Sequence, residues 1–215
     1  MTSTLQRGGL LAAATLALTL PACTSDDSSD SSASSSSSSS APAAETSAAP
    51  AIEGPFGPAC SALPAQGEGS VAGMADDPVG TAAQNNPLLT SLFQAVTAAH
   101  LGDSLNTQRD ITVLAPANPA FEALPPDQVK ALLVDSPRLT STLTHHVIQG
   151  RLTPEQLAGT HTTLNNDEIT IEGSGTGFTV AGTLTETNAT VICGNLETAN
   201  ATVYLIDQVL APAPQ

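Results

Sequence analysis

The hydrophobic positions between residues 86 and 155 recur mostly at helical spacing. Asn86–Pro87 places an N-cap residue before a proline at the first helical position. Apolar residues then repeat every three or four positions, namely Leu88, Leu89, Leu92, Phe93 and Val96. Similar start signals predict three further short helices, which begin at Pro125–Pro126, Ser136–Pro137 and Thr153–Pro154.

The pattern changes to that of strands toward the carboxyl end. Short segments rich in β-branched residues lie at 168–172, 178–180, 189–192 and 201–206, separated by glycine and asparagine. One earlier strand is predicted at 111–114. Helices first and strands later predict an α+β domain rather than a doubly wound one.

A separate apolar run begins at Leu10 and ends at Cys23. It is shorter than the ~20 residues that a membrane-spanning helix needs, and it follows the basic Arg7, which predicts a signal peptide over 1–22. Leu20–Cys23 resembles a bacterial lipobox, which predicts cleavage before Cys23 and lipid on its thiol. The alternative is an ordinary secretory signal followed by a chance cysteine. Both interpretations place the mature protein outside the cytoplasm.

The segment after Cys23 is almost entirely serine, alanine, aspartate, threonine and proline, with seven consecutive serines at Ser34–Ser40. It has too little apolar surface to offset the entropy of ordering. We therefore expect residues 23–55 to carry the lipid and form a disordered tether, which could also carry O-linked sugar. Residues 56–215 remain for a single domain with its own core.

The charge balance excludes several classes of partner. Twenty acidic residues face five basic ones, a net charge of −15, and removal of Arg7 with the signal peptide makes it −16. Nucleic-acid binding requires a basic footprint, which is absent from the sequence. A basic membrane-binding face is absent for the same reason, so membrane contact is expected only through lipid on Cys23. We expect no cofactor and a monomer.

Three cysteines leave one natural pair. If Cys23 carries lipid, Cys60 and Cys193 remain, and outside the cytoplasm such a pair favours a disulfide. A zinc site is disfavoured because neither cysteine has a second ligand at short spacing.

Three segments together resemble the fasciclin domain family. Residues 112–125 resemble the first signature of that family, residues 143–164 resemble its middle segment, and residues 193–212 resemble its second signature. The resemblance covers about 75–212 and implies a compact β-wedge or sandwich with several helices packed against it.

Three shorter segments narrow the resemblance to the mycobacterial secreted antigens and surface lipoproteins built on one fasciclin domain. They are residues 56–60, 70–78 and 85–87. In that subgroup a disulfide joins the positions that match Cys60 and Cys193, which agrees with the pairing expected from the cysteine count.

The signature residues have physical roles that the sequence suggests. Pro116 fixes φ and, with Asn118, predicts a turn that leaves the strand. Phe121 is expected on a short turn and in the core. Asp207 lies in an apolar strand, so its charge is either on the solvent face or paired within a loop network. Asn200 lies in the second signature, as a structural or partner-contact residue.

His145–His146 occupies the place of a Tyr-His pair that the family commonly has, and that pair is proposed to take part in adhesive contacts with cell-surface receptors. The tyrosine is absent here, so we interpret His146 as a buried, hydrogen-bonded residue that braces a strand against a loop. A metal site with His161 is conceivable but disfavoured, because successive residues point in different directions.

Catalysis finds little support in the sequence. No serine lies in a Gly-x-Ser-x-Gly elbow. Gly173–Gly177 lacks the lysine and helix of a phosphate-binding loop, so it predicts a hairpin turn. An enzyme is therefore not expected.

We expect instead an adhesion or binding module that contacts protein or glycan partners at a cell surface. It would be exported and anchored to the outer face of the cell membrane, with release into the medium left open. The alternative is an extracytoplasmic carrier that holds a small apolar ligand in a crevice of the domain. An exposed apolar patch would favour the protein partner, and an enclosed apolar pocket would favour the carrier.

Overall fold

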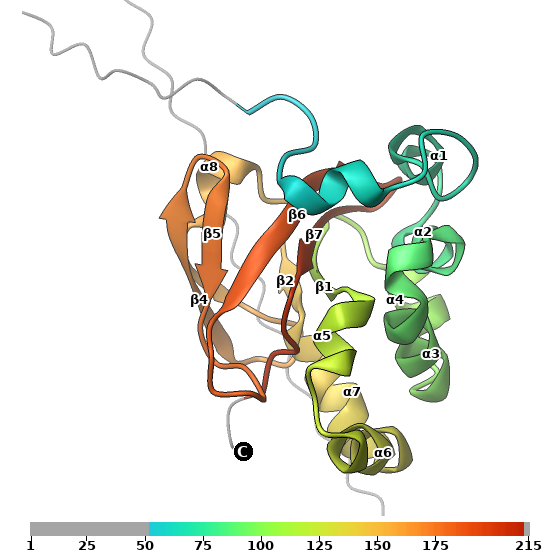
Figure 1. The fold of residues 1–215 in the computed structure, drawn as a ribbon, viewed down its shortest axis with the longest axis vertical. Coiled ribbons are helices and arrows are strands. Elements are labelled where there is room, and N and C mark those ends of the chain that lie inside the picture. The colour runs from blue at the N-terminus through green and yellow to red at the C-terminus, as the bar shows by residue number, and fades with distance from the viewer. Residues whose placement is uncertain (1–51, 213–215) are drawn as a thin grey trace, which may run out of the picture. The chain divides into compact units, whose positions relative to one another are not determined.

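The computed structural model describes residues 52–212, so the predicted signal peptide, Cys23 and most of the tether lie outside the described residues. Seven strands form one sheet with the order β2-β1-β7-β6-β5-β4-β3 (Figure 1). In chain order the strands are β1 (Ile111–Pro116), β2 (Val147–Gln149), β3 (Gly159–Thr162), β4 (Glu168–Ser174), β5 (Gly177–Val180), β6 (Ala189–Glu197) and β7 (Ala201–Ile206). Neighbouring strands are antiparallel except for β1 and β7, which are parallel.

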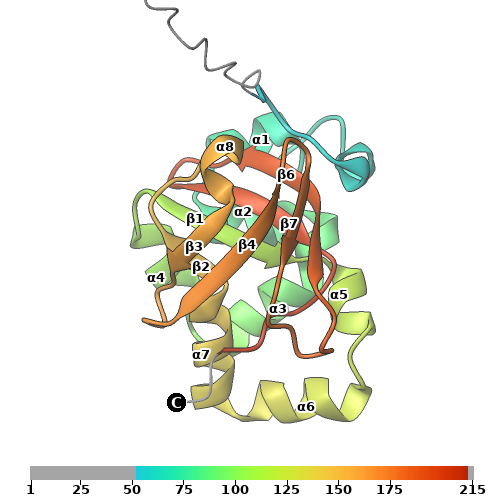
Figure 2. The same cartoon turned by 90° about the vertical axis from the view of Figure 1, so that its left-hand side faces the viewer.

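The sheet curls until its two ends meet (Figure 2). Ile148 of β2 forms a bridge with Thr163, directly after β3, and the Leu164 N–H donates to the Val147 carbonyl over 2.8 Å. The register between β6 and β7 shifts once before and once after Cys193. Such bulges bend a strand and increase its twist, which helps the sheet to close.

Eight α-helices and two 3₁₀ turns accompany the sheet within the described residues. They are η1 (Pro58–Ala62), α1 (Val71–Ala75), α2 (Val79–Asn85), η2 (Pro87–Leu89), α3 (Thr90–Ala98), α4 (Gly102–Thr107), α5 (Asn118–Glu122), α6 (Pro126–Val134), α7 (Ser136–His145) and α8 (Pro154–Leu157). The predicted α+β class is confirmed, and every predicted helix and strand is present. The sequence pattern did not reveal α1, α2, α4, α5, β2 or β3, and Phe121 lies in the helix α5 rather than on a turn.

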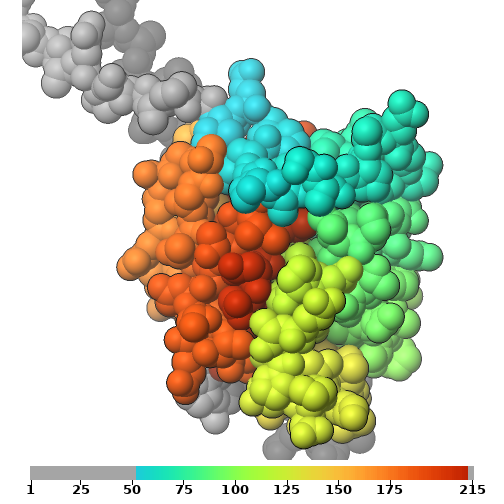
Figure 3. Space-filling model, in the orientation of Figure 1, coloured from blue at the N-terminus to red at the C-terminus, as the bar shows by residue number. Residues whose placement is uncertain are grey.

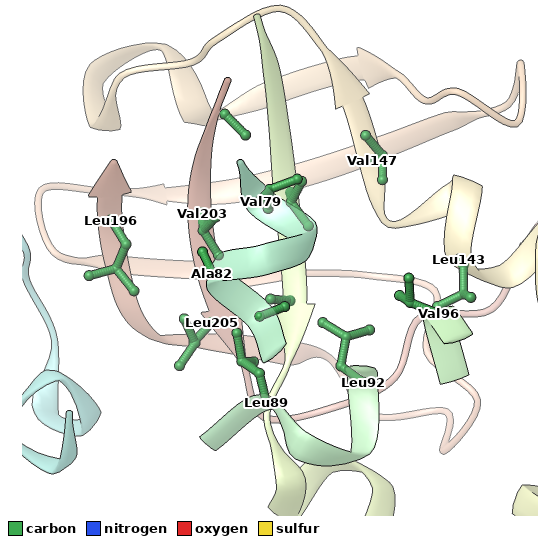
Figure 4. Packing of buried hydrophobic residues seen from close by; sticks show 14 of the residues in the cluster. Val79, Ala82, Leu89, Leu92, Val96, Leu143, Val147, Leu196, Val203 and Leu205 are labelled. Atoms are coloured by element: carbon green, nitrogen blue, oxygen red, sulfur yellow. The ribbon is translucent and has the colours of Figure 1, made fainter. Parts of the chain in front are cut away.

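The strands β1 and β7 are buried on both faces. Alternate residues of a strand point to opposite faces, so Val203 and Leu205 of β7 contact one hydrophobic cluster, while Tyr204 and Ile206 contact another. The first cluster lies between the sheet and the helices. Figure 4 shows Ala82 of α2 and Leu89 of η2 on the side of Val203 and Leu205, and Val96 of α3 beside Leu143 of α7. The second cluster fills the inside of the curled sheet.

The amino-terminal segment of the domain is fastened to β6. Phe56 and Gly194 exchange two backbone hydrogen bonds of 3.1 and 2.8 Å. A Cβ atom at Gly194 would lie 2.5 Å from the Phe56 ring and 2.8 Å from the Tyr204 ring, so only glycine allows this approach.

Candidate functional site

His146 joins three parts of the domain at the end of α7. Its ring is 2% exposed, with Nδ1 2.7 Å from the Thr142 carbonyl oxygen, and its Nε2 lies 3.0 Å from the Leu210 backbone nitrogen. A carbonyl can only accept and an N–H can only donate, so Nδ1 carries the proton and Nε2 accepts. The Leu114 N–H also donates to the His146 carbonyl over 2.8 Å.

These contacts hold the His146 ring in its neutral form. Burial is the main cause that lowers its pKa, and the nearby His145 lowers it further. The hydrogen bond to the Thr142 carbonyl acts in the opposite direction, and the resulting pKa is about 4. A proton on Nε2 would place a donor against the Leu210 N–H and break the link between α7 and the carboxyl-terminal segment.

His145 belongs to a different network, centred on the carboxylate of Asp167. His145 Nδ1 lies 2.7 Å from Asp167 Oδ1, and Asn165 Nδ2 donates to Asp167 Oδ2 over 2.8 Å. The Thr163 hydroxyl donates to the same carboxylate. Partial burial raises the pKa of Asp167, but the three donors outweigh it and bring the pKa to about 2. No local sequence pattern marks Asp167 as the partner of His145, which is 22 residues away in the chain.

The residues of the first signature hold α3 and α5 against the end of β1. Pro116 is buried at the last position of β1. The Asn118 amide donates to the Pro87 carbonyl over 2.8 Å, and its oxygen accepts from the Ser91 N–H over 3.0 Å. Phe121 is partly buried and packs against two of the hydrophobic clusters.

Two polar residues of the second signature are bonded within the fold. Asn200 Nδ2 donates to the carbonyls of Leu105 and Gln108, each over 2.8 Å, and Oδ1 accepts from the Val79 N–H over 2.8 Å. Asp207 follows β7 directly and accepts from the Thr190 N–H over 2.6 Å. This partner belongs to the strand β6, so the contact differs from the loop network that was one of the two expected settings of Asp207.

Cys60 and Cys193 form a disulfide, as the cysteine count predicted. It connects η1 to the bulged part of β6 across 133 residues of sequence, with the two Cα atoms 5.0 Å apart.

A hollow at the surface of the described residues lies beside this disulfide, between the segment 54–65, α1 and the end of β6, and we call it the α1 groove. Its volume is about 700 Å³. Residues that line it include Gly54, Leu63, Ala65, Ala72, Ala75 and Glu197. In the space-filling view, the segment and α1 lie next to each other along the top of the molecule (Figure 3). No pattern in the sequence predicted this groove.

Two apolar cavities under the helices are much smaller. One is lined by His146, Phe93 and Leu143 among others and measures about 30 Å³, and the second measures about 20 Å³. Pockets for small ligands usually have at least about 300 Å³. Neither cavity offers the room that a carrier of an apolar ligand requires.

In residues 52–212, no three or more His, Cys, Asp or Glu side chains are grouped so that they could hold a metal ion. Over the same range, none of the helices has the length and apolar character that crossing a bilayer requires.

Comparison with known proteins assigns the family. The model of the Fasciclin domain family matches residues 87–212, which is more than half of the chain. The chain belongs to the fasciclin domain family.

Relatives of this fasciclin protein extend the match toward the amino terminus. Cell surface glycolipoprotein MPB83 of Mycobacterium bovis is 44% identical over 168 residues, which cover 74% of this chain and 73% of the relative. Immunogenic protein MPB70 of the same species is 43% identical over 164 residues, or 73% of this chain and 81% of the relative. The resemblance inferred from the sequence motifs is confirmed.

A solved structure has the same fold. The FAS1 domain pair from the insect cell adhesion molecule fasciclin I matches with a TM-score of 0.55 and 19% identity, over 66% of this chain. The match spans about half of that pair, at 52% of its length. This likeness establishes the fasciclin fold, with its curled sheet and flanking helices.

Within this fasciclin domain, the structure places most of the predicted site residues inside rather than on the surface. Pro116, His145 and His146 are buried, and Asn118 and Asn200 use their side chains for internal hydrogen bonds. No single contact brings these residues together at one surface site.

Proposed function

We propose that this protein is a lipid-anchored binding or adhesion module of the cell surface, which contacts protein or glycan partners through its fasciclin domain. The observation that carries the proposal is the family match over 87–212, together with 44% identity to a protein named as a cell surface glycolipoprotein. The lipobox-like Leu20–Cys23 supports attachment to the outer face of the cell membrane.

The named relatives support a binding role rather than a catalytic one. Their names describe a surface glycolipoprotein and an immunogenic protein, and the solved neighbour is a cell adhesion molecule. The cavities of about 20 and 30 Å³ are too small to support the carrier alternative, and the α1 groove, which exceeds the usual volume of a ligand pocket, is open to solvent rather than enclosed.

The test compares cells that produce the wild-type protein, Cys23→Ser or Thr24→Ser. The second variant is the control, since it changes the neighbouring residue and keeps the thiol. We expect the wild type and Thr24→Ser in the membrane fraction, and Cys23→Ser in the medium. Intact cells with the anchored protein should adhere to surfaces coated with matrix proteins or cell-envelope material, and the released protein should compete with that adhesion.

Each half of the proposal has its own contrary result. Cys23→Ser that stays in the membrane fraction, with no lipid on the amino-terminal peptide, would refute the anchor. Adhesion that is equal with and without the protein on all coated surfaces would refute the binding role.

A further inference from the structure

The α1 groove combines a small-residue apolar floor with a free strand edge. Ala65, Ala72 and Ala75 line it together with Leu63, so an extended main chain can approach closely. Glu197, at the end of β6, forms part of the opposite wall. Both Ala72 and Ala75 are exposed, which leaves the floor open to a partner.

The backbone of Glu197 is unpaired on the groove side. The residues on either side of Glu197 form their backbone hydrogen bonds toward β7. The Thr198 N–H donates to the carbonyl of Ala201, the first residue of β7, over 2.9 Å, and Leu196 is paired with Val203 of β7. Backbone groups of an antiparallel strand point alternately to its two sides, so those of Glu197 point away from β7. Among the described residues, no backbone group pairs with them there.

The chain itself already uses this side of β6 for strand pairing. Phe56 and Gly194 exchange hydrogen bonds on the side away from β7, in an antiparallel bridge. This edge therefore accepts an extended segment, and the pairing stops before Glu197.

The charged residues that line the groove or adjoin its lining segments in sequence are acidic, while Arg151 lies beyond the end of β6 and donates to the Thr198 carbonyl over 3.1 Å. Glu197 lines it, Glu53 precedes the lining residue Gly54, and Glu68 and Asp76 lie at the two ends of the α1 region. No lysine or arginine lines the groove. A partner with positive charge is therefore attracted, whereas an acidic one is repelled.

We propose that the α1 groove binds an extended segment of a partner protein in which small apolar and basic residues alternate. Side chains of an added strand point alternately to its two faces. The apolar side chains contact Leu63 and the alanine floor, and the basic ones contact Glu197 and the acidic rim. The proposal rests on the proposed binding function and specifies the partner.

The probe is a fluorescein-labelled peptide of four Val-Lys repeats, and its binding to the exported protein is measured by fluorescence anisotropy. A peptide of four Val-Glu repeats is the charge control. We expect saturable binding of the Val-Lys peptide that weakens with added salt, and no binding of the Val-Glu peptide. Absence of binding by the Val-Lys peptide, or equal binding of both peptides, would overturn the proposal.

Matched variants locate the binding. Ala72→Phe fills the groove from α1, and Ala131→Phe adds the same side chain to an exposed position of α6. We expect Ala72→Phe to weaken binding at least about tenfold, and Ala131→Phe to leave it unchanged. Equal effects of the two variants, both shown by circular dichroism to be folded, would place the binding elsewhere.

The charge of the rim is tested separately. Glu197→Gln should weaken binding roughly twofold to fivefold, since exposed charge pairs contribute little. Glu172→Gln, at an exposed position of β4, is its control and should change nothing. A Glu197→Gln variant that binds as the wild type does would remove the charge argument and overturn the basic part of the proposal.

The cell-adhesion assay separates this proposal from the function on which it rests. If the wild type mediates adhesion but does not bind the Val-Lys peptide, the groove proposal is wrong and the adhesive function stands. If the wild type gives no adhesion, the function fails, and the peptide measurements alone decide whether the groove binds basic segments.

Discussion

At the scale of single residues, His146 shows how hydrogen bonds fix a protonation state. Its Nδ1 donates to a carbonyl and its Nε2 accepts from the Leu210 N–H, so the folded domain accommodates only the neutral ring. Because the ring is buried, a proton would also bring an uncompensated charge into the interior. His146 therefore stabilises the fold, and a partner cannot reach its buried ring in this conformation.

We predict that His146 makes the domain less stable in acid. Its pKa is about 4 in the folded domain and 6.5 as the ordinary value for the unfolded chain. Between pH 6.5 and pH 4 the unfolded chain binds a proton at His146 that the folded domain excludes. Above pH 6.5 both states are unprotonated at His146, so the free energy of unfolding keeps its full value. Stability then falls as the pH is lowered toward 4, by about 3 kcal/mol. Urea unfolding at several pH values measures this decrease in the free energy of unfolding.

The variant His146→Ala should remove this pH dependence. It should also lower stability at neutral pH by ~1–3 kcal/mol, because Leu210 and Thr142 lose a partner. His100→Asn is the control, since His100 is exposed and its φ of 55° suits asparagine. Equal slopes for wild type and His146→Ala between pH 6.5 and 4 would contradict the prediction.

At the scale of elements, α2 and α4 depend on contacts distant in sequence. Both are short, with 7 and 6 residues, and they contain glycine, threonine and asparagine, which are weak helix formers. Asn200 accepts from the Val79 N–H at the start of α2 and donates to the Leu105 and Gln108 carbonyls around the end of α4. One side chain from the turn between β6 and β7 thus fixes two helices.

We predict that Asn200→Asp loosens both helices. The substitution keeps the shape but replaces two donated hydrogen bonds by an oxygen that faces two carbonyls. The expected loss in the free energy of unfolding is ~2–3 kcal/mol, with faster hydrogen exchange in α2 and α4. Asn188→Asp makes the same change at an exposed loop position and should stay within ~0.5 kcal/mol of wild type. The idea fails if both variants unfold alike.

At the scale of the whole molecule, the disulfide closes a long loop of sequence in a domain whose hydrophobic core is complete without it. Cys60 and Cys193 are 133 residues apart in sequence. Two large hydrophobic clusters, one on each face of β1 and β7, are formed mainly by residues other than the cysteines. The cross-link adds stability chiefly by restricting the unfolded chain.

Reduction of the disulfide should therefore lower the melting temperature without unfolding the domain at room temperature. The chain-entropy model gives at most ~5 kcal/mol for such a loop, which corresponds to a decrease in the melting temperature of at most roughly 10–20 °C for a domain of this size. Calorimetry on oxidised and reduced protein measures the shift, and the double variant Cys60→Ser/Cys193→Ala should match the reduced protein. Loss of the far-ultraviolet dichroism on reduction at 25 °C would disprove it.

The elements that the sequence predicted correctly carry their own local signals. The helix at Thr90–Ala98 follows a proline-marked start, and its large apolar residues Leu92, Phe93 and Val96 recur at helical spacing. The strand β4 begins with alternating residues, of which Ile169 and Ile171 are buried. Such periodicity reflects one face turned to a core, so it is visible without knowing what lies opposite. The family resemblance and the disulfide could also be inferred from motifs and the cysteine count.

The rest depended on groups that are far apart in the chain. The short helices α2 and α4 are held by Asn200, more than 90 residues from the end of α4, and local propensity does not predict them. Asp167 as the partner of His145 and the α1 groove beside Glu197 likewise arise where distant segments meet. The sequence by itself determined which residues have an apolar face to bury and where the helices with proline-marked starts begin. Only the tertiary structure decided which polar groups satisfy one another and which surface stays open, because both depend on contacts that the fold creates.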